Sequence, residues 1–265
     1  MTTSNDNWNS GDPYEYFMGR WSRLMAPQFL TWLKLPANLK WIDLGCGTGA
    51  LSEAIYNQCT PSHLTSMDPS REFLDKAGTR LSGKTDLVVG SASAIPLPSQ
   101  TLDVVVSGLA INFFPELETA FFEMKRVVKP DGVIAAYVWD YSGRMEFLRI
   151  FWDTACEIDE EGKKSDEGVR FPLCDRTQLA KSFEKAGLLN IETAFLDIET
   201  LFENFEDFWS PFLGGQGPAP GYLASLSKMK QEEFKLAIRK KLPVQQDGSI
   251  KLLARAIAVK SICRK

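Results

Sequence analysis

A glycine-rich segment between an apolar run and a helical pattern is the feature that most restricts how this chain can fold. The apolar run Leu39–Leu44 predicts a buried strand, and the segment DLGCGTGA, residues 43–50, overlaps its end. Glycines at alternate positions let the backbone turn tightly and let a ligand approach with no Cβ in the way. The segment therefore predicts a strand, a loop that faces a ligand, and a helix.

Strand-like and helix-like stretches alternate from Lys40 to Trp139. Further apolar runs predict four more strands, at His63–Asp68, Leu87–Gly90, Leu102–Ser107 and Val133–Trp139. The stretches between them carry apolar residues at helical spacing, Ser70 is a candidate helix cap, and KPDG at 129–132 predicts a turn. Buried strands that are separated by helices predict an α/β fold with a parallel sheet covered on both faces.

The alternation ends after Asp140. We expect a helix over 143–158, a charged solvent-exposed loop over 159–168, a strand at Ile191–Ile198, a glycine-rich loop over 214–221, a helix over 222–242 and a strand at Ile250–Ile262. Aromatic residues recur at helical spacing between Phe202 and Phe212. They favour core packing, and a hydrophobic wall for an apolar acceptor is the alternative.

Composition limits the classes of partner. The chain has 265 residues, 44% of them apolar, and a net charge of -4, so general electrostatics does not attract nucleic acid or anionic lipid. Its five cysteines are dispersed and form no CxxC pair, which argues against a disulfide framework and against a metal site. The N-terminus has no apolar signal core, and no stretch reaches the ~20 apolar residues of a membrane span. We expect a cytoplasmic protein with no metal and no nucleic-acid partner.

The glycine segment alone leaves two ligands open. Gly45, Gly47 and Ala50 also satisfy the GxGxxG/A pattern of a nicotinamide-dependent oxidoreductase. Asp43 argues against a pyrophosphate, which prefers bare amides, because a carboxylate aimed at the loop would repel it. The same carboxylate suits a ligand that carries an ammonium and a sulfonium. The charge of Asp43 therefore favours S-adenosylmethionine over NAD. Asp68 ends the next strand, where a carboxylate can accept both ribose hydroxyls.

Four segments within residues 14–140 carry a family resemblance. They are WIDLGCGTGALSEAI from Trp41, SMDPS from Ser66, GSASAIPLPSQTLDVVVSGLAINFFPE from Gly90 and EMKRVVKPDGVIAAYVWD from Glu123. In this order they resemble class I S-adenosylmethionine-dependent methyltransferases, in the subgroup of ubiquinone/menaquinone-biosynthesis-type small-molecule enzymes. The resemblance implies a Rossmann-like seven-stranded sheet with helices on both faces, an antiparallel last strand and a helical cap. It also implies methyl transfer from S-adenosylmethionine to a small-molecule acceptor.

The resemblance further implies which residues bind the cofactor. Asp43 would face the methionine amino group and Asp68 the ribose, while the loop would line the cofactor with Gly45, Cys46, Gly47 and Gly49. The residues expected beside the adenine or at the end of the fourth strand are Pro69, Ser70, Ser91, Ala92, Ser107 and Leu109. Many relatives have an acidic residue where this chain has Ser91, so its hold on the adenine amino group would be weaker.

The segment before the core and the end of the fifth strand offer further candidates. We expect the N-terminal aromatic segment to fold over the cofactor, with Arg20 meeting its carboxylate. A methyl group on a sulfonium is already activated, so catalysis rests mainly on proximity and alignment. A base for an oxygen or nitrogen acceptor would come from one of the weak candidates Tyr14, Tyr16, Asp140 and Tyr141.

The sequence also suggests a domain plan. We expect a disordered tail at 1–13 and a single methyltransferase domain at 14–265. Its parts would be an N-terminal cap helix at 14–38, the cofactor-binding core at 39–140, an acceptor-side cap at 141–249 and a terminal strand at 250–265. A non-catalytic cofactor-binding protein of the same fold stays open, and the sequence predicts neither the acceptor nor the oligomeric state.

Overall fold

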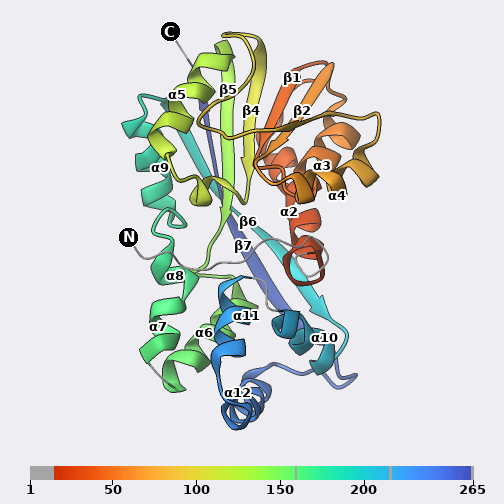
Figure 1. Ribbon diagram of the computed structural model, residues 1–265, viewed down its shortest axis with the longest axis vertical. Coiled ribbons are helices and arrows are strands. Elements are labelled where there is room, and N and C mark those ends of the chain that lie inside the picture. The colour runs from red at the N-terminus through yellow and green to blue at the C-terminus, as the bar shows by residue number, and fades with distance from the viewer. Residues whose placement is uncertain (1–14, 159, 215–216, 264–265) are drawn as a thin grey trace. The chain divides into compact units, whose positions relative to one another are not determined.

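The computed structural model describes residues 15–158, 160–214 and 217–263, which form two compact units (Figure 1). The first, called the sheet unit here, comprises Ser22–Trp139, Leu173–Leu196 and residues 256–263. The second, called the helical unit, comprises residues 15–21, Asp140–Pro172 and Asp197–Arg255. The predicted tail at 1–13 and Tyr14 lie outside the described residues, and the predicted domain plan stays a prediction.

A seven-stranded sheet confirms the fold predicted from the sequence. Its strands are β1 (Lys40–Leu44), β2 (His63–Asp68), β3 (Asp86–Val89), β4 (Leu102–Gly108), β5 (Val128–Trp139), β6 (Leu189–Phe202) and β7 (Ile250–Ile262). They are arranged in the order β3-β2-β1-β4-β5-β7-β6. The pairs from β3 through to β5 are parallel, whereas β7 runs antiparallel to β5, as expected. This order places β1 and β4, with their buried apolar side chains, in the interior of the sheet.

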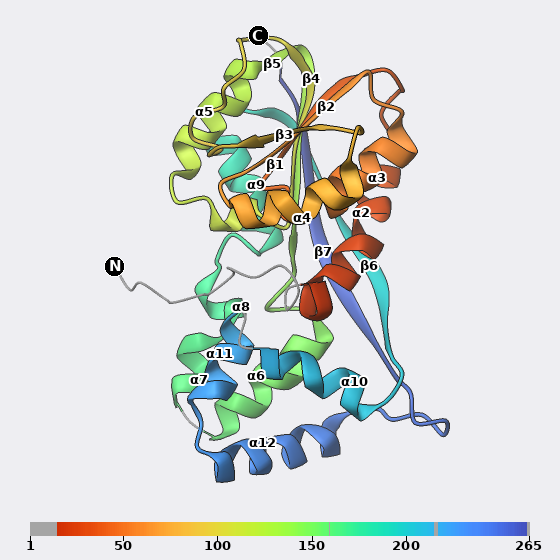
Figure 2. The ribbon, with the colours of Figure 1, turned by 45° about the vertical axis from the view of Figure 1, so that its right-hand side comes forward.

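Helices cover both faces of the sheet within the sheet unit. The elements are most of α2 (Arg20–Leu33) together with α3 (Ala50–Cys59), α4 (Arg71–Leu81), α5 (Leu117–Val127) and α9 (Arg176–Lys185). Figure 2 shows α3 and α4 on one side of the strands and α5 and α9 on the other. Ser70 caps α4 as predicted, since its Oγ accepts from the backbone N of Phe73 at 3.3 Å. The alternation of parallel strands and helices thus places the carboxyl ends of β1, β2 and β4 at the same edge of the sheet.

The predicted KPDG turn at 129–132 lies inside a strand instead of before one. β5 begins at Val128, and its register with β4 changes from Leu102↔Val128 to Val104↔Val133. Asp131 has a left-handed backbone, with φ of +61°. The turn residues are therefore extra residues of β5 that interrupt the β-ladder, because the strand pairs with β4 on both sides of them.

The helical unit is held together by aromatic side chains. Its helices are η1 (Glu15–Gly19), α6 (Glu146–Ile158), α7 (Glu160–Ser165), α8 (Glu167–Arg170), α10 (Phe205–Trp209), η3 (Ser210–Gly214), α11 (Pro218–Ser225) and α12 (Lys228–Lys241). Phe151 stacks on Phe212 with ring centroids 4.7 Å apart. The rings of Phe151 and Phe234 meet edge to face, with centroids 4.8 Å apart. Phe202, Phe208, Trp209 and Phe212 are buried, and Phe205 is half-buried and stacks on Trp209, which confirms the interpretation that these aromatic residues pack in a core.

Three sequence expectations for this unit are wrong. The charged stretch 159–168 is not a solvated loop: its described residues contain α7 and the start of α8, and Asp166 and Glu167 are buried. The glycine-rich loop ends at Gly217, since α11 begins at Pro218, and the long helix predicted over 222–242 is two helices. The first error has a tertiary cause, because Asp166 and Glu167 are buried by their contacts with Arg149 and Trp152. The break before α12 has a local one that sequence reasoning missed, the N-cap at Ser227.

None of the helices in the described part of the chain combines the length and the apolar character that crossing a bilayer requires.

Candidate functional site

The glycine loop between β1 and α3 is fastened to the end of β2. Gly45 N and Cys46 N both donate to the carbonyl of Met67, at 2.8 and 3.1 Å. Gly47 N donates to Asp68 Oδ2 at 2.9 Å. These bonds hold the loop across the carboxyl ends of two neighbouring parallel strands, which is where ligands bind in open α/β sheets.

The three glycines of this loop serve different purposes. All have positive φ, at +71° for Gly45, +54° for Gly47 and +89° for Gly49. A Cβ on Gly45 would lie 2.5 Å from the Cβ of Ala110, and one on Gly49 would lie 2.7 Å from Leu81 Cδ1. A Cβ on Gly47 would meet nothing within 4 Å among the described residues. Gly45 and Gly49 are therefore required for packing, whereas Gly47 borders open space in which a ligand can lie.

Asp43 is a buried carboxylate with one oxygen committed and one free. Its Oδ2 accepts a hydrogen bond from Ser52 Oγ at 2.7 Å, and Ser52 in turn lies 2.6 Å from Ser66 Oγ. Its Oδ1 is buried and has no hydrogen-bond partner within the described part of the chain. Burial raises the pKa of Asp43 to about 7, aided by the charge of Asp68 and opposed by the bond from Ser52. A cationic ligand at Oδ1 would remove this penalty.

Asp68 lies at the end of β2 with both oxygens directed into the loop region. Oδ2 accepts from Gly47 N, and Oδ1 accepts from Ser70 N at 2.8 Å. Burial raises the pKa of Asp68, and the two backbone bonds oppose that shift. Each carboxylate oxygen has more than one acceptor site, so Asp68 retains capacity for hydroxyl donors while it holds the loop.

The remaining cofactor candidates of the sheet unit lie near the same strand ends. Ser107 is fully buried at the end of β4, and its Oγ has no hydrogen-bond partner among residues the structure describes. Leu109 has a φ of +59°, and its backbone N donates to Tyr137 O at 2.8 Å. Ala92 is buried, while Ser91 is exposed and its Oγ accepts from Ser93 N at 3.2 Å. Ser107, like Asp43, presents a buried polar atom for which the described residues supply no partner.

Cys46 contributes backbone, not a reactive thiol. Burial raises the pKa of its thiol well above the ordinary value, and the carboxylates of Asp43 and Asp68 raise it further. The Sγ atom makes only a weak contact with Gly47 O, at 3.8 Å. A thiol held in its neutral form is a poor nucleophile, which agrees with a role in shaping the loop.

Sequence reasoning missed the polar chain that supports Asp43. The chain runs from Ser52 through Ser66 to Thr85, whose Oγ1 lies 2.8 Å from Ser66 Oγ. The signal was present, since Ser52 falls on the otherwise apolar, buried face of α3. A small polar residue in such a position needs a buried partner, and Asp43 is that partner. The contact of Ala110 with Gly45 was also missed, because it depends on the fold of the segment after β4.

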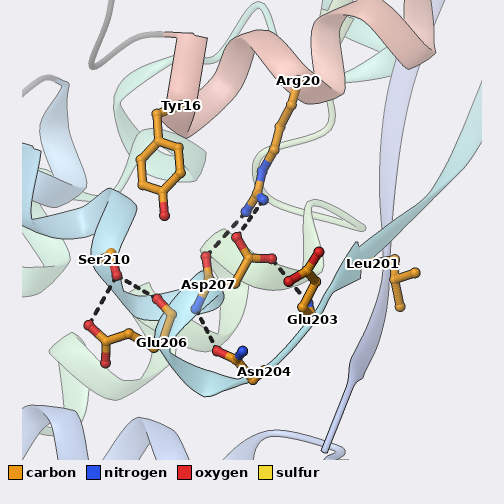
Figure 3. Close-up of a pocket in the computed structure, with 8 residues that line it drawn as sticks. All are labelled: Tyr16, Arg20, Leu201, Glu203, Asn204, Glu206, Asp207 and Ser210. Carbon is orange, nitrogen blue, oxygen red and sulfur yellow. Dashed lines mark hydrogen bonds and ion pairs between the residues drawn. The ribbon is translucent and has the colours of Figure 1, made fainter.

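Arg20 belongs to the helical unit, where it binds an aspartate. Its Nη1 donates to Asp207 Oδ1 at 2.8 Å (Figure 3). Its guanidinium also lies over the rings of Trp21 and Phe202, at 4.3 and 4.8 Å from the ring centres. It lines a cavity of about 530 Å³ with Tyr16, Leu201, Glu203, Asn204, Glu206, Asp207 and Ser210. The expected contact between Arg20 and a cofactor carboxylate stays a prediction, and the structure supplies a competing partner.

The described base candidates also belong to the helical unit. Asp140 Oδ2 accepts from the backbone N of Arg144 at 3.1 Å, in a turn where a Cβ on Gly143 would clash with the carboxylate at 2.2 Å. Tyr141 is buried beside Phe171, with ring centroids 5.9 Å apart. Tyr16 is half exposed, and its hydroxyl points toward α10 in Figure 3. Local packing accounts for Asp140 and Tyr141, so Tyr16 is the described candidate with the most accessible side chain.

Comparison with known proteins agrees with this geometry. A family model described as "Methyltransferase domain" matches residues 42–136. Demethylmenaquinone methyltransferase of Lactobacillus johnsonii is 32% identical over 113 residues, which are 40% of this chain and 46% of that protein. Sterol 24-C-methyltransferase ERG6B of Gibberella zeae is 31% identical over 106 residues, 38% of this chain and 28% of that protein. The alignments thus span less than half the length of these curated relatives.

A solved structure extends the similarity to most of the chain. Phosphoethanolamine N-methyltransferase 2 of Haemonchus contortus, crystallised with S-adenosyl-L-methionine, has a TM-score of 0.58 and 15% sequence identity. The match covers 96% of this chain and 56% of that one, and an identity this low shows only that the two folds are similar. The family match contains the glycine loop, Asp43, Asp68 and Ser107. Residues 42–136 therefore match a methyltransferase domain, and the chain as a whole is similar in fold to an S-adenosylmethionine-dependent methyltransferase.

Proposed function

We propose that this protein transfers a methyl group from S-adenosylmethionine to a small-molecule acceptor. One observation carries the proposal: the buried Oδ1 of Asp43 has no partner among the described residues and stands beside a loop whose Gly47 borders open space. An unpaired buried carboxylate oxygen costs stability unless a ligand satisfies it. An ammonium group is a fitting donor, and a pyrophosphate is not, which favours S-adenosylmethionine over a nicotinamide dinucleotide.

The side chains and backbone at the strand ends are of the chemical types that this cofactor needs. Asp43 would accept from the methionine ammonium, and Asp68 would accept from the ribose hydroxyls. The loop residues Gly45, Cys46, Gly47 and Gly49 would line the ligand with backbone, so that no side chain intrudes. The adenine would lie beside Pro69, Ser70, Ser91 and Ala92, with Ser107 and Leu109 at the end of β4. Ser91 is exposed and can offer its hydroxyl to the base.

The chemistry asks little of the side chains. When bound, the cofactor supplies a methyl group on a sulfonium that is already activated for in-line displacement. The protein's residues would hold donor and acceptor in line and exclude water, which accounts for most of the expected rate enhancement. An oxygen or nitrogen acceptor would need a base, and Tyr16 is the candidate with an accessible side chain. Tyr14, Asp140 and Tyr141 stay candidates on the sequence argument alone.

The acceptor is proposed to be an apolar or aromatic small molecule. Two relatives are named for demethylmenaquinone and sterol substrates. The family model ends at residue 136, so the segment expected to form the acceptor pocket lies outside it. Within the described residues no disulfide joins any of the five cysteines, which supports the expected cytoplasmic location.

Calorimetric titration tests the proposal directly. S-adenosylmethionine and S-adenosylhomocysteine are expected to bind the full chain, and NADH is not. Turnover of S-adenosylmethionine with demethylmenaquinone analogues, sterols and small phenols then separates an enzyme from a non-catalytic cofactor-binding protein. Binding of NADH in place of both sulfur ligands would assign the site to an oxidoreductase. Binding without turnover over the whole panel would favour the non-catalytic alternative.

A further inference from the structure

Basic charge is concentrated on one helix of an acidic protein. The sequence of α12, KMKQEEFKLAIRKK, has six basic and two acidic residues, a formal charge of +4, in a chain whose net charge is -4. The net charge of the whole chain conceals this patch, because acidic residues exceed basic residues in the rest of the chain. A local surface of this kind attracts an anionic partner even where the net charge does not.

The inner side of α12 is anchored to its own unit. Phe234 and Ile238 are fully buried. Lys241 Nζ lies 2.7 Å from Glu157 Oε2, and the ammonium of Lys235 lies 5.7 Å from the ring centre of Trp209. Arg239 lies over Phe205 at 5.1 Å. These contacts identify the side of α12 that packs against its own unit.

The outer side of α12 exposes two large apolar side chains. Met229 is 71% exposed and Leu236 is 58% exposed. They are seven residues apart, a spacing of two helical turns, so they lie on the same face. Lys240 follows Leu236 by one turn on that face. Folding does not account for this exposure, because the core contacts of the helix are made by its other side.

The cations around this apolar pair are available to a partner. Among residues that the structure describes, Lys228, Lys230 and Lys240 form no ion pair. The two acidic residues of the helix, Glu232 and Glu233, are exposed between the basic ends and weaken the patch without cancelling it. The result is an amphipathic helix whose solvent side carries Met229 between Lys228 and Lys230 at its start, and Leu236 one turn before Lys240.

We propose that α12 docks this protein reversibly onto an anionic lipid bilayer, with Met229 and Leu236 inserted among the headgroups and Lys228, Lys230 and Lys240 at the lipid phosphates. Interfacial helices bind by this combination of buried apolar area and attraction to anionic lipid. Nucleic acid would use the lysines alone and leave both apolar side chains in water. The proposal goes beyond the methyltransferase function and does not depend on it, since docking requires neither cofactor nor acceptor.

Vesicle sedimentation with the full chain tests the docking. We expect partition onto phosphatidylcholine vesicles that contain phosphatidylglycerol, little partition onto phosphatidylcholine alone, and weaker partition as salt increases. The double variant Met229→Ser/Leu236→Ser should lose partition by at least about ten-fold. The triple variant Lys228→Gln/Lys230→Gln/Lys240→Gln should lose it by a comparable or larger factor. The opposite change, Glu232→Gln/Glu233→Gln, should strengthen partition several-fold.

Matched controls separate α12 from the rest of the surface. Phe122→Ser/Val169→Ser removes two apolar side chains of similar exposure, 64% and 61%, that lie on other helices. Lys34→Gln/Lys163→Gln/Lys181→Gln removes the same charge elsewhere, and both control variants should partition as the unchanged protein does. Affinity for S-adenosylhomocysteine, measured on every variant, should be unchanged and so reports separately on the proposed function.

Three results would overturn the docking proposal. The first is that the protein does not bind anionic vesicles at all. The second is that the α12 variants and the control variants lose equal amounts of partition. The third is that replacing Glu232 and Glu233 does not strengthen partition. Tight binding to duplex DNA or RNA that survives Met229→Ser/Leu236→Ser would assign the patch to nucleic acid instead. Circular dichroism and unfolding temperature confirm that each variant is folded, which is expected because the substituted side chains are exposed.

Discussion

Ser52 Oγ donates to Asp43 Oδ2 at 2.7 Å, while the other oxygen of the same carboxylate has no partner in the described part of the chain. The hydroxyl fixes the orientation of the carboxylate, so that Oδ1 is the oxygen presented to a ligand. Asp43 is adjacent in the sheet to Ser66 on β2 and to Val106 on β4. This position, in the interior of the sheet at the ends of parallel strands, is the basis of the first two predictions.

Replacing the carboxylate should weaken cofactor binding. Asp43→Asn keeps the shape and a hydrogen-bond acceptor but removes the charge that pairs with the ligand ammonium. A charge-assisted hydrogen bond is worth about 1.5–3 kcal/mol, so affinity for S-adenosylmethionine and S-adenosylhomocysteine should fall by about 10- to 100-fold in calorimetry. Asp86→Asn, an exposed carboxylate beside His63, is the control and should bind normally. Equal affinity of Asp43→Asn and the unchanged protein would contradict the assignment.

Cofactor affinity should rise with pH between 6 and 8. The pKa of Asp43 is about 7 in the free protein, raised by burial, and a bound ammonium favours the charged form and lowers it. Below pH 7 the carboxyl must lose its proton before it can pair with the ammonium. Each further unit of decrease in pH should therefore lower the affinity by a factor that approaches ten. Calorimetry at pH 6, 7 and 8 measures the slope. Asp43→Asn should flatten it, and a slope that persists in this variant would locate the titrating group elsewhere.

Glu167 should make the protein less stable at alkaline pH. Burial raises its pKa to about 8 from an ordinary value of 4.5, so between these values the folded protein retains a proton that the unfolded chain has lost. Stability from this group is therefore greatest below pH 4.5 and declines as pH rises toward 8. Glu167→Gln keeps an acceptor for Trp152 Nε1 and removes the titration. At pH 8 it should increase the free energy of unfolding, on the order of a few kcal/mol, and leave it little changed at pH 5.

Urea unfolding at pH 5, 6.5 and 8 checks this difference. Glu161→Gln, at an exposed position of α7, is the matched control and should follow the unchanged protein at each pH. Asp43 contributes a dependence of the same sign, and it is present in all three proteins. The pH dependence of the difference between Glu167→Gln and the control therefore isolates Glu167. A difference that does not vary with pH would rule out the buried, protonated carboxyl.

The glycines of the loop should respond unequally to alanine. Gly49→Ala places a Cβ 2.7 Å from Leu81 Cδ1 at a φ of +89°, and Gly45→Ala places one 2.5 Å from Ala110 Cβ. Each should lower the free energy of unfolding by about 1–3 kcal/mol. Gly47→Ala meets open space, so it should cost only the strain of its backbone, about 1 kcal/mol, yet reduce cofactor affinity. Urea unfolding and calorimetry separate the two effects, and a stability loss at Gly47 as large as at Gly49 would contradict the packing argument.

Arg20 has two possible partners that mutation can separate. If Arg20 meets the cofactor carboxylate, as the sequence predicts, Arg20→Ala weakens S-adenosylhomocysteine binding, whereas Asp207→Asn releases the guanidinium and does not. Arg20→Ala should in either case lower stability by about 1 kcal/mol, because it removes the ion pair with Asp207 and the contact with Trp21. Calorimetry on both variants is the measurement. Unchanged affinity in Arg20→Ala would leave the residue a structural role only.

Several features of the sheet unit were predictable from local patterns. The runs His63–Asp68 and Ile250–Ile262 coincide with β2 and β7 because a buried strand requires continuous or alternating apolar residues over a short length. Ser70 was predictable as a cap because the chemistry of capping is local. The acidic stretch after α6 was not, since Asp166 is buried by a contact with Arg149, seventeen residues away.

The sequence by itself determined the resemblance to methyltransferases, the strand-loop-helix unit and the two aspartates at the ends of β1 and β2. These follow from residue types at short spacing, where backbone geometry leaves few alternatives. Only the tertiary structure decided that one oxygen of Asp43 has no partner among the described residues, that Arg20 binds Asp207, and that α12 turns Met229 and Leu236 to solvent. Each of these depends on partners distant in the chain, because burial and hydrogen-bond satisfaction are properties of the packed fold, which no local pattern records.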